Sequence, residues 1–114
     1  MDRLQRNATL LRALHKSSPK VRKQIIKTCK KDLIKCICDC CKNILSGHIP
    51  LKPHQLKSLR RSRRHIRSLA AKKTPLNKKK ALLQRQSGGF LSALLSPIVS
   101  VLGGLLGNIF NSGS

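Results

Sequence analysis

The stretch IKTCKKDLIKCICDCCKNI, residues 26–44, decides the fold class. Its apolar and cysteine side chains recur every three or four residues, the spacing that puts side chains on one face of an α-helix. The stretch therefore predicts helix to about Ser46, with Gly47 as the glycine that ends it. The helix is either continuous or broken near residues 30–32, where Asp32 would be an N-cap, and we favour the break. The recurring residues are Ile26, Cys29, Leu33, Ile37, Cys40 and Ile44.

Stop signals and apolar stripes predict further helices on both sides. Ser17-Ser18-Pro19 ends a first helical stretch and begins the next, because serine is a good N-cap and proline suits the first helical position. Residues 48–53 contain two prolines and form an extended connector, and a helix then begins near Pro53. A short basic helix follows Thr74-Pro75. The first and third apolar stripes are Leu4, Leu11, Leu14 and Leu56, Leu59, Ile66, Leu69.

The chain carries 25 Lys and Arg against three Asp and Glu, a formal net charge of +22. Every charged residue lies within residues 1–85, so the remaining 29 residues are uncharged. This division predicts three parts: N-terminal helices with a cysteine cluster (1–47), a basic helical DNA-binding segment (48–86), and a Gly-Gly hinge with a hydrophobic tail (87–114). The predicted fold is all-α, a small bundle of four or five short basic helices followed by a separate hydrophobic C-terminal helix.

The basic segment predicts binding to phosphate rather than to bases. A large uncompensated positive charge favours a polyanionic partner. The two aromatic residues, Phe90 and Phe110, lie outside this segment, so it offers no aromatic platform for base stacking. The alternatives are a solvated surface and a localisation signal within residues 60–64. The expected DNA contacts are Lys57, Arg60, Arg61, Arg63, Arg64, Arg67, Lys72, Lys73, Lys78, Lys79 and Lys80.

Five cysteines lie within residues 29–41, and their arrangement favours packing over chemistry. Free cysteine packs as a small hydrophobe. Intermolecular disulfides are one alternative, and a zinc site formed by Cys38, Cys41, His48 and His54 is another, although a helical cluster would have to unwind to bind zinc tetrahedrally. With three carboxylates and no orienting group for a Cys–His pair, we expect no enzymatic activity and no cofactor.

The uncharged run from Phe90 to Phe110 is long enough to cross a bilayer as a helix. Small or polar side chains recur in it at every fourth position, a pattern that lets helices approach closely in lipid. The run therefore predicts membrane contact or self-association, with packing against the bundle as the alternative. The stripe consists of Ser92, Ser96, Ser100, Gly104 and Asn108.

The order of a basic body, Gln86-Ser87-Gly88-Gly89 and an apolar, proline-containing tail resembles the precursor of the small adenoviral core peptide mu. The resemblance covers residues 75–105. It implies DNA condensation, and cleavage between Gly89 and Phe90 by a viral cysteine protease whose recognition pattern admits Gln at the fourth position before the cut. The helical, cysteine-bearing body departs from that short arginine-rich peptide.

The N-terminal stretches LLRALHK (10–16) and SPKVRK (18–23) are similar to small basic proteins of adenovirus-like mobile elements, the Polinton and adintovirus group. Residues 1–16 also have the basic, amphipathic character of a mitochondrial presequence, a less favoured interpretation. Together, the resemblances imply a minor virion core protein in the virion and host nucleus, with double-stranded DNA, a viral protease and capsid proteins as partners. The main alternative is a membrane-active or membrane-anchored viral accessory protein, and a third is a host basic protein of a ribosome or chromatin.

Overall fold

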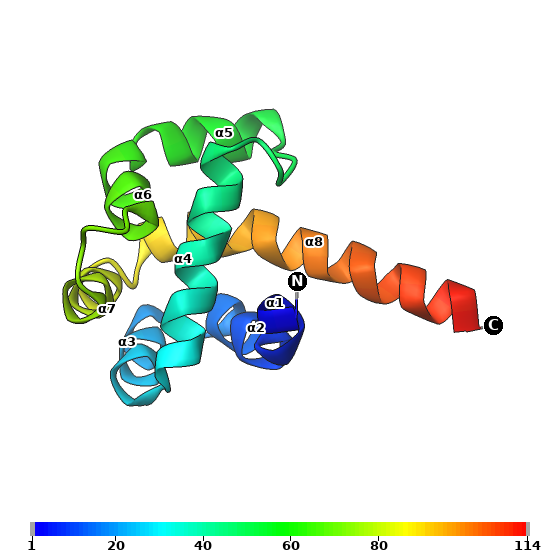
Figure 1. Ribbon diagram of the computed structural model, residues 1–114, viewed down its shortest axis with the longest axis horizontal. Coiled ribbons are helices and arrows are strands. Elements are labelled where there is room, and N and C mark those ends of the chain that lie inside the picture. The colour runs from blue at the N-terminus through cyan, green and yellow to red at the C-terminus, as the bar shows by residue number, and fades with distance from the viewer. Residues whose placement is uncertain (1, 114) are drawn as a thin grey trace.

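The computed structural model describes the backbone of residues 2–113 and the side chains of residues 3–103, and in this part of the chain all regular structure is helical (Figure 1). The all-α prediction is therefore confirmed. Seven helices precede the hydrophobic one, where four or five were predicted, because breaks at Asn7 and at Arg61-Ser62 divide two predicted helices. The helices are α1 (Asp2–Arg6), α2 (Ala8–Lys16), α3 (Pro19–Thr28), α4 (Lys31–Leu45), α5 (Pro53–Arg60), α6 (Arg63–Ala70), α7 (Leu76–Arg85) and α8 (Gly89–Gly113).

Local capping explains where α3 begins and α4 ends. The Ser18 hydroxyl accepts a hydrogen bond from the Val21 backbone N–H (3.3 Å), and Pro19 occupies the first turn of α3. Gly47 follows α4 with a φ of 78°, and the backbone N–H groups of Gly47 and His48 return to carbonyls of the last turn. This is a Schellman cap, which needs a left-handed residue at the glycine position. Both predicted boundaries are confirmed.

The predicted break between α3 and α4 is present, but its cap is different from the one we expected. Lys30 is the N-cap residue and its side chain makes no capping hydrogen bond. Asp32 lies instead in the first turn of α4, where its carboxylate accepts hydrogen bonds from Arg3, Arg6 and Asn7. A carboxylate in this turn also faces the positive end of the helix dipole, so Asp32 stabilises the start of α4 without capping it.

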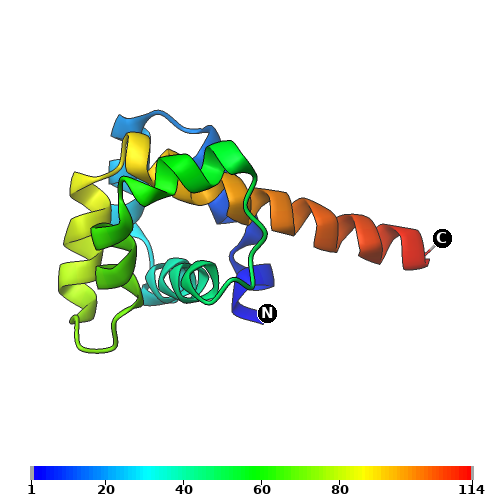
Figure 2. The ribbon, with the colours of Figure 1, turned by 90° about the horizontal axis from the view of Figure 1, so that it is seen from above.

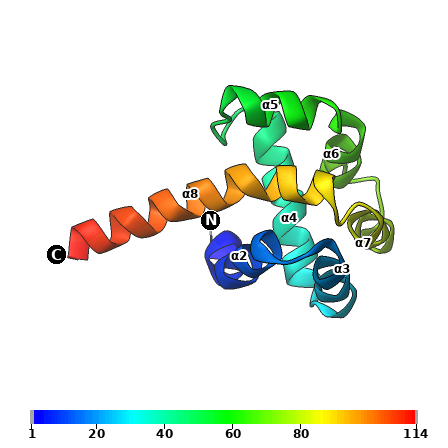
Figure 3. The ribbon, with the colours of Figure 1, turned by 180° about the vertical axis from the view of Figure 1, so that it is seen from behind.

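Helix α4 runs through the middle of the molecule, with α5 and α6 near its C-terminal end and α1–α3 near its N-terminal end (Figure 1). It packs most extensively against α6 and also contacts α7 and α1, while α7 packs against α3. Seen from above, α4 is viewed nearly end-on and α5 runs alongside α8 (Figure 2). From behind, α8 passes between α5 and α2 (Figure 3).

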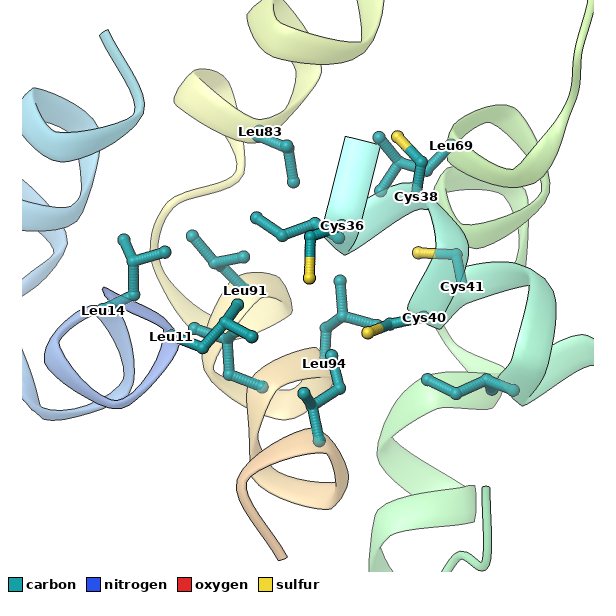
Figure 4. Packing of buried hydrophobic residues seen from close by; sticks show 14 of the residues in the cluster. Leu11, Leu14, Cys36, Cys38, Cys40, Cys41, Leu69, Leu83, Leu91 and Leu94 are labelled. Atoms are coloured by element: carbon teal, nitrogen blue, oxygen red, sulfur yellow. The ribbon is translucent and has the colours of Figure 1, made fainter. Parts of the chain in front are cut away.

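The separate position expected for the hydrophobic helix is not confirmed. Up to Leu102, α8 supplies a row of buried side chains to the same apolar cluster as α2, α4 and α7 (Figure 4). The predicted division of the chain at residue 87 therefore does not correspond to a division of the core. The physical reason is that short basic helices offer little apolar surface to one another, and α8 provides what they lack. The buried residues of α8 are Phe90, Leu91, Leu94, Leu95, Ile98 and Leu102.

Within the described residues, no single helix has both the length and the apolar character needed to cross a membrane. Helix α7 and the part of α8 through Gly103 meet these criteria only as a pair, and they are bent by 106° at the turn between them.

A buried arginine of α3, Arg22, forms hydrogen bonds with the end of α2 and with that turn. The Arg22 guanidinium of α3 donates to the carbonyls of Leu14 (2.7 Å) and His15 (2.8 Å) in the last turn of α2. It also reaches the carbonyls of Ser87 (3.4 Å) and Gly88 (3.3 Å) between α7 and α8. Its charge is thus balanced by carbonyl dipoles, including those at the negative end of α2.

Candidate nucleic-acid interface

The arginines of residues 60–67 surround an open hollow on α5 and α6. Buried Leu59, Ile66 and Leu69 hold these two helices against the core. Because the apolar residues take one face of each short helix, the arginines between them are left exposed. The hollow has a volume of about 600 Å³ and is lined by Arg60, Arg61, Arg63, Arg64, His65, Arg67 and Ser68. We call it the arginine hollow.

The arginine hollow has no acidic residue nearby in sequence, because residues 48–86 contain none. The ion pairs among the side chains of residues 3–103 lie elsewhere, between Arg3 and Arg6 of α1 and Asp32 and Asp39 of α4. Hydrogen bonds from Asn7 and then Arg6 lower the pKa of Asp32. The hydrogen bond to Asp39 raises the pKa of Arg3. The acids thus neutralise α1 and leave the charge of the hollow uncompensated.

Nine of the eleven predicted DNA contacts are exposed, as a phosphate-binding role requires. Lys72 and Lys73 lie in the loop between α6 and α7, and Lys78 lies on the outer side of α7. Lys80 is half-buried. Lys79 is an exception, because it retains only 8% of its accessible surface and lies on the buried face of α7. The exposed contacts are Lys57, Arg60, Arg61, Arg63, Arg64, Arg67, Lys72, Lys73 and Lys78.

Sequence reasoning missed two residues of the hollow, His65 and Ser68. The His65 ring is tilted by 58° against the ring of Phe90, with 5.3 Å between centroids. This contact joins the wall of the hollow to the first turn of α8. The position of His65 among the three arginines of α6 was the signal that could have identified it, since it shares their helix.

The cysteines of α4 pack as apolar side chains. Cys36, Cys38, Cys40 and Cys41 are buried free thiols, and burial raises the pKa of Cys41. In Figure 4, Cys38 lies beside Leu69 of α6, while Cys36 lies nearer to the leucines of α2 and α8. The core-packing interpretation agrees with this arrangement.

The alternative zinc ligands do not converge. His48 and His54 are exposed, whereas Cys38 and Cys41 are buried. Among the residues that the structure describes, no three His, Cys, Asp or Glu side chains are grouped so as to hold a metal ion. A tetrahedral site would need both histidines to enter the core.

The expected cleavage site lies in an ordered turn rather than in an open linker. Residues 86–88 form the turn between α7 and α8, and Gly89 begins α8. Ser87 and Phe90 are buried, and Arg22 reaches the carbonyls of Ser87 and Gly88. A protease that binds an extended chain would therefore have to open this turn first.

The small-residue stripe of α8 is partly used inside the fold. The Ser96 hydroxyl accepts a hydrogen bond from the buried side-chain amide of Gln55 in α5 (3.1 Å). Ser92 is half-buried and Ser100 is exposed. Of Gly104 and Asn108 the structure describes the backbone alone. The stripe thus packs against the bundle at Ser96. Self-association through the other residues of the stripe stays a prediction.

Comparisons of this chain with protein-family models, curated proteins and solved structures found no match.

Proposed function

We propose that this chain binds double-stranded DNA through its phosphates, without sequence preference and without enzymatic activity, and condenses it as a minor virion core protein. The observation that carries the proposal is the arginine hollow, where five exposed guanidinium groups lie together with no acidic residue in their segment. Guanidinium groups bind phosphate in a planar, bidentate manner, and few protein groups compete for them here.

Charge balance over the whole chain supports condensation rather than the binding of one duplex. Exposed cations also line α3 and the loop before α7, so positive charge is not confined to one face. A protein of net charge +22 can therefore contact more than one duplex and reduce the repulsion between them.

Duplex binding is tested by measuring the affinity for a short labelled duplex at several salt concentrations. Each phosphate contact contributes about 0.9 to the slope of log affinity against log salt. The variant R61Q/R64Q/R67Q removes three side chains of the hollow, and we expect its slope to be smaller by up to ~2.7.

The matched control is K20Q/K23Q/K27Q, which removes three exposed charges from α3 and leaves the same net charge. We expect this control to reduce affinity much less than the hollow variant does. Equal losses in the two variants would show that only net charge matters, and an affinity independent of salt would exclude the proposal.

We further propose that proteolytic maturation after Gly89, together with capsid contacts, belongs to this role. The sequence Gln86-Ser87-Gly88-Gly89 supports it, and Arg22 makes cleavage dependent on opening the turn. Incubation of the free and DNA-bound protein with a Gly-Gly-directed viral cysteine protease, followed by mass spectrometry, tests it. A cut elsewhere, or none in either state, would remove this part of the proposal.

A membrane role is the second candidate, and the bent pair formed by α7 and α8 favours it, since the pair passes the length and composition criteria for a span. In this role the basic helices would bind anionic head groups while α8 enters the bilayer. Leakage of anionic vesicles at protein concentrations that leave duplex DNA unbound would favour this candidate.

A further inference from the structure

A second surface feature lies beside the arginine hollow. The end of α4, the connector to α5, and helices α5 and α6 form a groove of about 220 Å³. Buried Ile44, Leu59 and Ile66 belong to its lining. Leu45 and Leu56 also line it, yet they keep 48% and 40% of their accessible surface. Two leucines this exposed in one groove, together with buried apolar neighbours, form a surface that another molecule would stabilise by covering. We call it the leucine groove.

Two arginines join the leucine groove to the arginine hollow. Arg60 and Arg63 line both features, so each apolar contact in the groove lies next to an uncompensated positive charge. The complement of such a surface is an apolar side chain flanked by carboxylates. A ligand that fills the groove would therefore use the same two arginines as a phosphate in the hollow.

The size and charge of the leucine groove favour one class of binding partner over the others. Its volume is below the roughly 300–1,000 Å³ of small-molecule pockets, so it suits one or two anchoring side chains of a larger partner. A second copy of this chain is disfavoured, because two of its three acids are already paired with arginines of α1. A bilayer surface contacts protruding residues, whereas Ile44, Leu59 and Ile66 of this groove are buried.

We propose that the leucine groove binds an acidic, amphipathic segment of a partner protein, with leucine-like anchors in the groove and carboxylates on Arg60 and Arg63. Helical segments bind grooves of this kind through anchors at positions i, i+3 or i+4, and i+7. Because two arginines are shared, this partner and a duplex compete for the protein. The predicted competition rests on the proposed DNA binding. Peptide binding in the leucine groove does not depend on it.

The test uses the full chain and a fluorescein-labelled synthetic peptide with leucines at i, i+3 and i+7 and glutamates beside them. A peptide of the same composition in scrambled order has the same charge but no apolar stripe. We expect the amphipathic peptide to bind more tightly than the scrambled one. We expect L56Q to weaken its binding about tenfold, the effect of losing one partly buried leucine contact.

The matched control variant is L10Q, since Leu10 of α2 is similarly exposed, at 44%, but lies outside the groove. We expect L10Q to bind the peptide as the unchanged protein does, and both variants to keep their duplex affinity. The amphipathic peptide should also displace duplex at a lower concentration than the scrambled peptide, and L56Q should remove that difference.

The outcomes separate this proposal from the preceding one. Equal binding of the two peptides, or equal losses in L56Q and L10Q, would overturn the groove. Binding to phosphatidylcholine–phosphatidylserine vesicles that depends on Leu56, without peptide binding, would assign the surface to a membrane instead. If the protein bound the peptide but no duplex, the groove would stand and DNA binding would fail.

Discussion

At the scale of single residues, Arg22 shows how a very basic chain keeps a buried cation. Arg22 is 7% exposed, and the hydrogen-bond acceptors of its guanidinium are backbone carbonyls of two different segments. A carboxylate is thus not required, because the C-terminal carbonyls of α2 already carry partial negative charge. The same hydrogen bonds fix the turn between α7 and α8. Arg22 therefore links the stability of the fold to the geometry of the expected cleavage site.

Replacement of Arg22 by methionine keeps an unbranched apolar stem but removes these donors. We expect R22M to lower the free energy of unfolding by about 3 kcal/mol, because buried carbonyls lose hydrogen bonds from a charged group. Urea denaturation followed by circular dichroism measures this loss. Lys23 is exposed on the same helix, so K23M should leave stability within ~0.5 kcal/mol. Equal stability of R22M and K23M would refute this account of Arg22.

Asp32 makes stability depend on pH in the acid range. Hydrogen bonds from Asn7 and Arg6 lower its pKa below the ordinary value of 3.8. Its stabilising effect is therefore complete above that value and is lost as the pH falls through the lower pKa of the folded state. We expect the urea midpoint of the unchanged protein to fall more between pH 6 and pH 2 than that of D32N. Parallel pH profiles would show that Asp32 contributes nothing to acid sensitivity.

Lys79 shows that a count of charged residues does not reveal which of them are buried. It was expected to contact DNA because it lies in a run of three lysines, yet it is buried. Leu76, Lys79 and Leu83 are three and four residues apart, so they share one face of α7. The helical phase was thus present in the sequence and would have placed Lys79 on the inner face. The side chain can lie there because its long apolar stem covers core residues.

At the scale of elements, glycine occupies positions 47 and 103 for different reasons. Gly47 has the left-handed φ of 78° that ends α4, whereas Gly103 is an exposed residue of α8. An added Cβ would meet no atom within 4 Å at either position. The difference between the two sites is therefore one of backbone conformation alone.

Alanine at these two glycines should change stability in opposite directions. We expect G47A to cost about 1–2 kcal/mol, the price of a side chain in left-handed backbone. We expect G103A to add ~0.5–1 kcal/mol, because alanine restricts the unfolded chain and favours helix. Thermal unfolding of both variants by circular dichroism measures the shifts. A loss of stability in G103A as large as that in G47A would contradict this assignment.

Helix boundaries marked by specific residues could be predicted, and those without such residues could not. Pro19 and Pro53 restrict the backbone, Gly47 allows the left-handed conformation, and each of the three lies at a helix end. The break at Arg61-Ser62 contains neither glycine nor proline, and its N-cap residue Ser62 makes no capping hydrogen bond, so the local signal that separates α5 from α6 is weak. That break turns the chain to form the arginine hollow. The residues of the site were therefore predictable, but their concave arrangement depends on tertiary packing.

At the scale of the whole molecule, the hydrophobic segment is the main difference between expectation and structure. Leu91, Leu94, Leu95 and Ile98 follow helical spacing, so the sequence contains the stripe that enters the core. Periodicity does not say what covers such a stripe. A segment of 21 uncharged residues suits a bilayer and a protein core equally well. The choice depends on the apolar faces of the other helices, which leave space for α8 between α2 and α5.

The placement of α8 predicts opposite results for two truncations. Chain 1–89 lacks every buried leucine of α8, and each one contributes ~1.5–3 kcal/mol. Five such apolar residues, from Leu91 to Leu102, together match the whole stability of a typical domain, ~5–15 kcal/mol. We therefore expect chain 1–103 to unfold cooperatively in urea. We expect chain 1–89 to show little helical circular dichroism in buffer and no cooperative unfolding transition in urea. A cooperative transition in chain 1–89 would show that the basic helices fold alone. If chain 1–89 unfolds as expected yet still binds duplex, flexible charge suffices for binding, and cleavage after Gly89 would convert a folded protein into a flexible polycation.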